Sequence, residues 1–114
     1  MLDPVSLTLI GTAILAIAVI SFKKIVQWFR SKSYLTKDNA AAVGVLIARK
    51  MNHKTYHEVN IGFSNPNANT QIVKAVYDEQ TGEVLAAEAE ESRNAPDQET
   101  RRAIAAGNGM VVFR

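Results

Sequence analysis

The longest uncharged stretch of the chain lies near its N-terminus. No charged residue occurs between Asp3 and Lys23, and residues 5–22 are mostly apolar. As an α-helix, residues 5–22 would be about 27 Å long, which is close to the thickness of the hydrocarbon core of a bilayer. The few serine and threonine hydroxyls can bond to backbone carbonyls inside such a helix. The pattern therefore predicts a single transmembrane helix.

Two other interpretations of residues 5–22 compete with a membrane anchor. A cleaved signal peptide carries positive charge before its apolar stretch, whereas here Asp3 comes before it and Lys23 and Lys24 come after it. A buried helix of a soluble protein would have a polar face, and this segment shows none. Both comparisons favour the membrane anchor.

Basic residues follow the apolar segment and predict its orientation. Positively charged flanks of a membrane helix stay in the cytoplasm, and Lys23, Lys24, Arg30 and Lys32 all come after the helix. We therefore expect the N-terminus to face outward and the rest of the chain to be cytoplasmic, in the cell inner membrane or a thylakoid membrane. The residues expected at the membrane interface are Lys23, Lys24, Trp28 and Arg30.

Small residues recur within the predicted span. Thr8, Thr12 and Ala16 are spaced four residues apart, and Gly11 lies beside Thr12. Small side chains at this spacing allow two transmembrane helices to approach closely. We expect these four residues to contact integral membrane protein subunits.

The neck after the predicted span continues as a helix. Its apolar residues fall on one stripe at helical spacing, namely Phe22, Ile25, Val26 and Phe29. This stripe either rests in the membrane interface or docks on a neighbouring membrane subunit.

Residues 33–114 predict a compact α+β domain behind the anchor and basic neck of residues 1–32. A helix is expected over about residues 38–51, because apolar residues recur there at helical spacing. Gly44 either weakens this helix, by about 1 kcal/mol relative to alanine, or allows close packing on a sheet. The apolar residues of the helix are Val43, Leu46, Ile47 and Met51.

Strand patterns occupy the middle of the domain. Alternating side chains over about residues 55–63 predict a strand, and residues 64–69 have the composition of a loop. A β-hairpin is the clearest local signal, with strands over about 70–77 and 83–89 joined by a tight turn. Gly82 can supply the positive φ that such a turn needs.

The last part of the domain predicts a helix and a short strand. Pro96 fits the first turn of a helix, and Gly107 fits its end. The full order is therefore α-β-β-β-α-β, which gives a mostly antiparallel sheet with two packed helices. The final apolar residues pair as a strand in this sheet, or dock on the sheet of a partner. They are Met110, Val111, Val112 and Phe113.

Charge divides the chain into a basic half and an acidic half. Residues 22–54 contain one acid, Asp38, whereas acids outnumber basic residues from residue 55 onward. The basic neck would be attracted to anionic lipid headgroups by about 1 kcal/mol per suitably placed charge. The acidic half argues against nucleic acid as a partner. The basic residues of the first half are Lys23, Lys24, Arg30, Lys32, Lys37, Arg49, Lys50 and Lys54.

The residue types offer no recognisable chemistry. The chain has no cysteine, which excludes disulfides and thiolate catalysis. His53 and His57 are four residues apart near a strand, where they would stand about 13 Å apart without a third metal ligand. The acids Glu88, Glu90 and Glu91 are interpreted as a solvated strand end. We therefore predict no catalytic residue, cofactor, metal site or small-molecule substrate.

Three functions remain open on this basis. The first is a non-enzymatic accessory subunit of a membrane complex, whose domain covers or stabilises the cytoplasmic face. The second is a membrane tether or adaptor that recruits a soluble protein partner, for example by adding a strand to an open sheet edge. The third is a small enzyme whose site forms only with a partner or within an oligomer.

Overall fold

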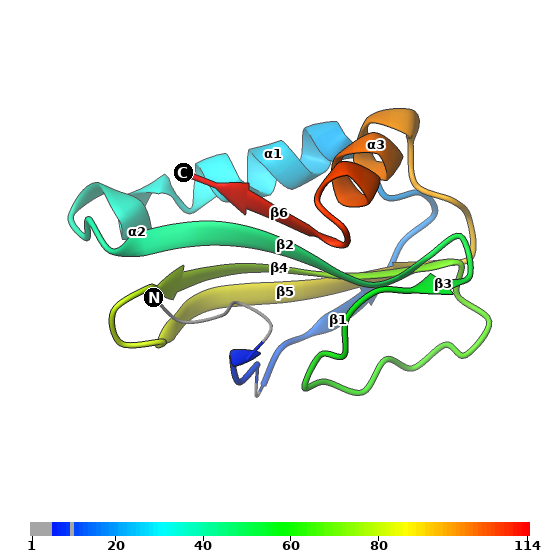
Figure 1. Cartoon of the computed structure of the whole chain (residues 1–114), viewed down its shortest axis with the longest axis horizontal. Helices are drawn as coiled ribbons and strands as arrows, with labels where there is room; N and C mark the ends of the chain where they lie inside the picture. Colours follow the sequence, from blue (N-terminus) through cyan, green and yellow to red (C-terminus); the bar gives the residue numbers. More distant parts are fainter. Residues whose placement is uncertain (1–5, 10) are drawn as a thin grey trace.

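A computed structural model describes residues 6–9 and 11–114 of the chain. These residues form a mixed α+β fold with a six-stranded sheet and three α-helices (Figure 1). The strands are β1 (Ile14–Ala16), β2 (Ala42–Met51), β3 (Lys54–Thr55), β4 (Thr70–Asp78), β5 (Val84–Ser92) and β6 (Met110–Phe113). The helices are α1 (Phe22–Ser31), α2 (Ser33–Lys37) and α3 (Gln98–Ala106).

The sheet is built around three long antiparallel strands. β2 pairs with β4, and β4 pairs with β5. The short strand β1 adds to the outer side of β5 in parallel. At the opposite edge of the sheet, two short strands pair with β2. β6 pairs with Gly44–Ile47, and β3 pairs with Lys50–Met51. The order is therefore β1-β5-β4-β2, followed by β3 and β6 at two positions along β2.

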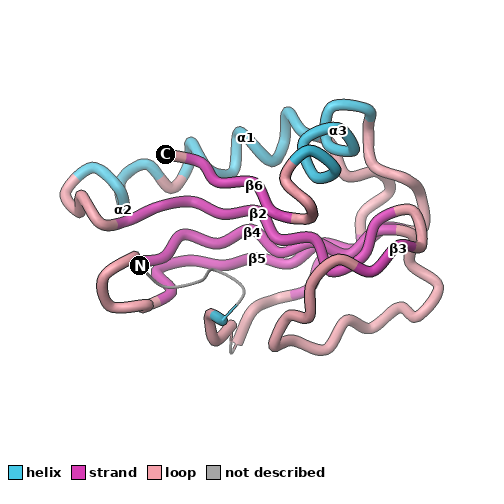
Figure 2. Tube along the Cα trace, in the orientation of Figure 1, coloured by secondary structure: helices cyan, strands magenta, loops and turns pink. Residues whose placement is uncertain are grey.

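Both faces of the sheet are covered. The helices α1 and α3 lie on one face, and the N-terminal residues and the loop of residues 56–69 lie on the other (Figure 2). Ile20, Ile25 and Ile104 are buried on the helix side. Leu7 and Leu9 are buried on the opposite side. The apolar N-terminal segment therefore contributes to both cores of its own chain.

The prediction of a transmembrane helix is wrong. No helix within residues 6–9 and 11–114 has the length and apolar character needed to cross a membrane. Ile14–Ala16 form a strand instead, and α1 begins only at Phe22. Leu7, Leu9 and Ile20 of this segment are buried in protein, and burial in protein satisfies apolar side chains as lipid does, so the hydrophobic pattern alone could not separate the two. Asp3, Val5 and Ile10 belong to the predicted membrane segment and its flank, and they lie outside the described residues.

The location and orientation predicted from that helix are wrong for the same reason. A single-pass placement in an inner or thylakoid membrane, with the N-terminus outward, required a spanning helix that the described chain lacks. The sheet also crosses the predicted boundary between residues 1–32 and 33–114, because β1 pairs with Ala89–Glu91 of β5.

The helix predicted over residues 38–51 is also wrong, because β2 occupies this region. Val43, Val45 and Ile47 face one core, and Leu46 and Ala48 face the other. A central strand buried on both faces is apolar almost without interruption, so it lacks the alternation of a half-buried strand. The strand predicted over residues 55–63 is reduced to Lys54–Thr55, which follow a turn with positive φ at Asn52 and His53.

The β-hairpin prediction is confirmed. β4 and β5 pair from Thr70↔Ser92 to Tyr77↔Val84, and Gly82 in the turn has a φ of 77°. The Asp78 carboxylate stabilises this turn by accepting hydrogen bonds from the backbone N–H groups of Gln80 and Thr81. A hydrogen bond from the Asn39 side chain, followed by these two backbone bonds, lowers the pKa of Asp78.

The last helix and the last strand are confirmed as well. α3 begins after its N-cap, Asp97, so Pro96 lies just before the helix and not in its first turn as predicted, and the helix ends before Gly107. Met110–Phe113 form β6, which pairs with β2 of the same chain. This last strand therefore belongs to the chain's own sheet.

Candidate functional site

The start of α1 is held in place by a single carboxylate. The two oxygens of Asp97 accept hydrogen bonds from the backbone N–H of Phe22, at 3.1 and 3.2 Å. The same carboxylate caps α3 by accepting from the backbone N–H of Thr100 at 3.1 Å. Asp97 therefore fixes the N-termini of two helices at once, where negative charge is favoured.

The pKa of Asp97 reflects this double role. Burial alone would raise the pKa, but hydrogen bonds from the Thr100 hydroxyl and from the backbone N–H groups of Phe22 and Thr100 outweigh that effect. The positive charge of Arg101 adds to them, and the pKa of Asp97 is lowered. The carboxylate is thus held in its charged form by the contacts that position α1.

Two hollows flank α1 on the helix face of the sheet. Val26, Phe29 and Arg30 line one of them, and Lys24, Gln27 and Trp28 line the other. The buried side of α1 is fixed by Ile25, which is 1% exposed. The helix therefore separates an apolar groove from a hollow that contains buried charges.

The first hollow, called here the apolar groove, has a volume of about 300 Å³. Its floor contains Phe29 and Phe113, whose rings stack with centroids 4.2 Å apart and an interplanar angle of 18°. Gly44 allows this arrangement, because a Cβ at that position would lie 2.7 Å from the Phe29 ring. Among the described residues, the lining is Val26, Phe29, Arg30, Ser33, Thr36, Ala42, Gly44, Val76, Phe113 and Arg114.

The charge along the apolar groove is positive. Arg30 is exposed at its edge, and the Arg114 side chain is 61% exposed although it pairs with Glu79 at 3.1 Å. Residues 22–37, which form α1, α2 and the junction between them, contain no acid. Their basic residues are Lys23, Lys24, Arg30, Lys32 and Lys37.

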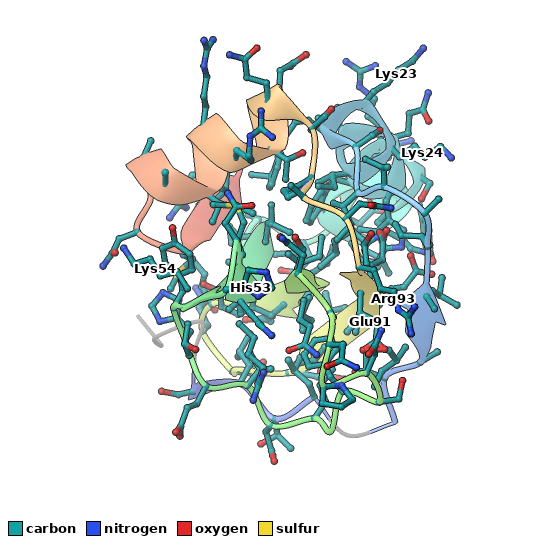
Figure 3. The ribbon with its side chains drawn as sticks, turned by 90° about the vertical axis from the view of Figure 1, so that its right-hand side faces the viewer. Lys23, Lys24, His53, Lys54, Glu91 and Arg93 are labelled. Atoms are coloured by element: carbon teal, nitrogen blue, oxygen red, sulfur yellow. The ribbon has the colours of Figure 1, made fainter. Side chains whose placement is uncertain are left out.

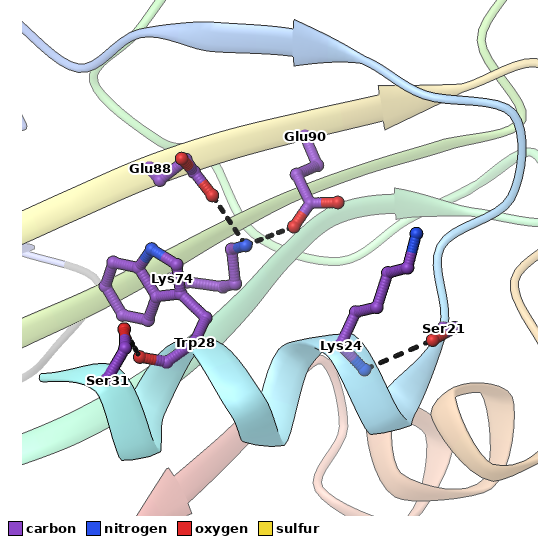
Figure 4. Close-up of polar contacts among 7 residues, drawn as sticks. All are labelled: Ser21, Lys24, Trp28, Ser31, Lys74, Glu88 and Glu90. Carbon is purple, nitrogen blue, oxygen red and sulfur yellow. Dashed lines mark hydrogen bonds and ion pairs between the residues drawn. The ribbon is translucent and has the colours of Figure 1, made fainter.

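The second hollow, called here the ionic hollow, has a volume of about 430 Å³. Its floor is the ammonium group of Lys74, which pairs with Glu88 at 2.8 Å and with Glu90 (Figure 4). The Trp28 ring centroid lies 5.2 Å from the same ammonium, within reach of a cation–π interaction. The residues of the described chain that line it are Leu15, Ile17, Ala18, Val19, Lys24, Gln27, Trp28, Lys74, Glu88 and Glu90.

The sequence interpretation missed this ionic cluster. Glu88 and Glu90 were expected to be solvated, but their side chains are only 30% and 9% exposed, and that of Lys74 is 4% exposed. A signal was present in the sequence, because Lys74 interrupts the apolar run of residues 72–77 and the two acids alternate along the next strand. The register Lys74↔Glu88 then brings the charges together.

A separate buried carboxylate lies on the opposite face of the sheet. Glu91 is 1% exposed and accepts hydrogen bonds from the Ser64 hydroxyl at 2.7 Å and from the backbone N–H of Asn65 at 3.2 Å. These bonds attach the loop of residues 56–69 to β5. Figure 3 shows Glu91 at the end of the molecule where His53 also lies, in the β2–β3 turn.

Four small residues were predicted to form a helix–helix contact, and none of them lies in a helix. Thr8, Gly11 and Thr12 line a hollow of about 290 Å³ beside the first part of β5. The Thr12 hydroxyl donates to the carbonyl of Leu9 at 2.8 Å. Ala16 is in β1, opposite Glu91. These residues therefore lie close to strand β5.

The residues predicted at a membrane interface are divided between the two hollows. Lys24 and Trp28 line the ionic hollow, Arg30 lines the apolar groove, and Lys23 is exposed on α1. The apolar stripe of the neck packs on the chain's own sheet, since Ile25 and Phe29 belong to the core beneath α1.

The described part of the chain contains no group of three His, Cys, Asp or Glu residues that could hold a metal ion. A ring nitrogen of His57 contacts the carbonyl of Asn108 at 3.0 Å, and His53 lies in the β2–β3 turn. No protein-family model, no curated protein and no solved structure matches the chain. Function must therefore be inferred from the geometry of its own residues.

Proposed function

We propose that this protein is a non-enzymatic binding module, an adaptor or accessory subunit, that holds a partner protein in the apolar groove. The observation that carries the proposal is an open, apolar groove with arginines at its edge. Phe29 and Phe113 line the groove as a stacked aromatic pair, and Arg30 provides an exposed positive charge beside them. Aromatic and arginine side chains are the residue types that dominate binding energy at protein interfaces.

The groove indicates the chemistry of the partner. Its floor suits an apolar side chain, which would bury the aromatic surface of Phe29 and Phe113. Its edge suits acidic residues on either side of that anchor, because residues 22–37 carry basic residues and no acid. Complementary charge speeds encounter and selects the partner, while burial of the anchor supplies affinity. The expected ligand is therefore a peptide segment with one apolar anchor and acidic flanks.

Binding is favoured over catalysis by the groove lining. The described residues that line it include two arginines, a serine and a threonine, and none of them has a histidine, cysteine or carboxylate side chain. A serine or threonine nucleophile needs a neighbouring base, and general acid–base catalysis needs a group that can exchange a proton. The groove residues supply apolar contact and fixed positive charge.

The test is a selection of random 12-residue peptides displayed on phage, with the full chain as bait. Selected peptides are then synthesised, and their affinities are measured by isothermal titration calorimetry. We expect an apolar residue flanked by aspartate or glutamate in the binders. Arg30→Glu should weaken them about tenfold or more, which is about 1.4 kcal/mol. Ala42→Leu, which fills the groove, should do the same.

The matched control is Lys23→Glu. It makes the same charge change on the same helix, but Lys23 is exposed and does not line the groove. We expect it to weaken binding less than threefold. Circular dichroism of each variant confirms that it is folded. A selection that yields no binders, or binders insensitive to both groove variants, would contradict the proposal. Equal weakening by Lys23→Glu would show that only the net charge is recognised.

A further inference from the structure

The ionic hollow contains more negative than positive charge at its floor. The Lys74 ammonium has three N–H donors and is already paired with Glu88 and Glu90, with the Trp28 ring beside it. One lysine therefore faces two carboxylates, of which Glu90 is shielded from water, with a side chain 9% exposed, and Glu88 is half-buried. A shielded carboxylate whose charge is incompletely compensated favours the approach of a further cation.

Two carboxylate oxygens remain available to such a cation. Lys74 uses Oε2 of Glu88 and Oε1 of Glu90. Within the described residues, Oε1 of Glu88 and Oε2 of Glu90 have no hydrogen-bonding protein partner, and neither is a buried unsatisfied atom. Both residues line the hollow. These two oxygens are suitable acceptors for the N–H groups of an ammonium ion.

A positive charge stands on the opposite wall. Lys24, in the first turn of α1, lines the same hollow, and its side chain forms no ion pair among residues 6–9 and 11–114 (Figure 4). The nearby start of α1 also favours negative charge. The two walls therefore differ in sign, with carboxylates along β5 and an ammonium group on α1.

The remaining walls are apolar and partly open. Leu15 and Val19 are large hydrophobic residues with 43% and 47% of their surface exposed. They line the hollow together with Ile17 and the Trp28 ring. A volume of about 430 Å³ falls within the range of small-molecule sites. The hollow thus combines separated opposite charges with an apolar surface.

We propose that the ionic hollow binds a small zwitterion, namely an ammonium and a carboxylate on a short apolar body, as in a free α-amino acid. Glu88 and Glu90 accept the ligand ammonium, and Lys24 binds its carboxylate. The apolar body lies against Leu15, Val19 and Trp28. This site is independent of the apolar groove, which lies on the other side of α1.

The test uses the full chain and its single tryptophan, Trp28, which forms one wall of the site. The twenty common amino acids are titrated up to 10 mM while Trp28 fluorescence is recorded, and calorimetry repeats each titration. We expect saturable binding of at least one amino acid with an apolar side chain. Its amide, which lacks the carboxylate, and its N-acetyl derivative, which lacks the ammonium, should each bind at least tenfold more weakly.

Variants then assign the two charges. Glu88→Gln removes one acceptor charge while Lys74 keeps Glu90, and Lys24→Met removes the opposite charge from an exposed position. Each should weaken binding at least tenfold, whereas Lys23→Met, an exposed neighbour outside the hollow, should change it less than twofold. Lack of saturable binding in both assays would overturn the proposal. So would equal binding of the amide or the N-acetyl derivative, or indifference to Lys24→Met.

Discussion

Replacing Gly44 by alanine should destabilise this protein, although the same change would stabilise an ordinary helix by about 1 kcal/mol. Gly44 lies in β2, directly beneath α1. A Cβ at this position would stand 2.7 and 2.8 Å from two ring carbons of Phe29 and 3.3 Å from the Cβ of Phe113. Because carbon atoms at contact lie about 3.5–4.0 Å apart, the Phe29 ring would have to move.

Two aromatic contacts hold the Phe29 ring in its place. It stacks on Phe113 with a centroid distance of 4.2 Å and meets Trp28 edge-on at 5.0 Å. Inserting a methyl group into such packing typically costs about 1–3 kcal/mol. This is a large fraction of the total stability of a small domain, which is about 5–15 kcal/mol. The sign of the effect thus distinguishes a packed strand from the predicted helix.

Equilibrium unfolding in urea measures this effect, with circular dichroism and Trp28 fluorescence as independent probes. Gly62→Ala is the matched control, because a Cβ there meets nothing within 4 Å, and its effect should stay within about 0.5 kcal/mol. In a Phe29→Leu background, the cost of Gly44→Ala should fall by about 1 kcal/mol, as expected for residues in contact. Stabilisation by Gly44→Ala, or a cost unchanged by Phe29→Leu, would refute the packing argument.

Two further predictions concern buried charge and the joint cap of the helices. Asp97→Ala should cost about 0.5–2 kcal/mol at pH 7, the usual range for an N-cap. The pKa of Asp97 is lowered in the folded protein, so its contribution is present above the unfolded pKa of about 3.9 and is lost as the pH falls through the folded pKa. Urea unfolding at pH 7 and at pH 2–3 should therefore show a smaller difference between wild type and variant in acid; an undiminished difference would contradict this reasoning. Lys74→Met should cost about 3–5 kcal/mol, because it leaves Glu90 unpaired in a largely buried site, and adding Glu88→Gln and Glu90→Gln should recover much of that loss. A triple variant no more stable than Lys74→Met would show that the ion pairs are not the source of the effect.

Local patterns in the sequence predicted the second half of the fold. The turn before β5 follows from Gly82, which has a φ of 77°, and the ends of α3 follow from the residues around Pro96 and from Gly107. The strand β6 follows from its apolar composition. The turn and helix signals depend on backbone conformation or capping, and the β6 signal on four neighbouring residues, so none of them needs knowledge of distant partners.

The candidate sites depend on partners that are distant in sequence. Lys74 and Glu88 meet through strand register, whereas Trp28 and Lys24 reach the same hollow from α1. The apolar groove requires Phe29 and Phe113, far apart along the chain, to stack above Gly44. The sequence identified Lys24, Trp28, Arg30 and Phe113 as residues of interest, but for a different environment.

Only the tertiary structure decided what the two apolar runs become. Residues 5–22 and 43–48 are apolar enough to satisfy a membrane helix, a buried helix or a strand covered on both faces. Val43–Ala48 became a central strand because β4 and β6 pair with its two edges while separate cores cover its two faces. Burial is favourable wherever water is excluded, and it includes Val43–Ala48 together with Leu7, Leu9 and Ile20, whereas Leu15 and Val19 stay exposed. The hydrogen-bonding partners supplied by distant strands determined their conformation.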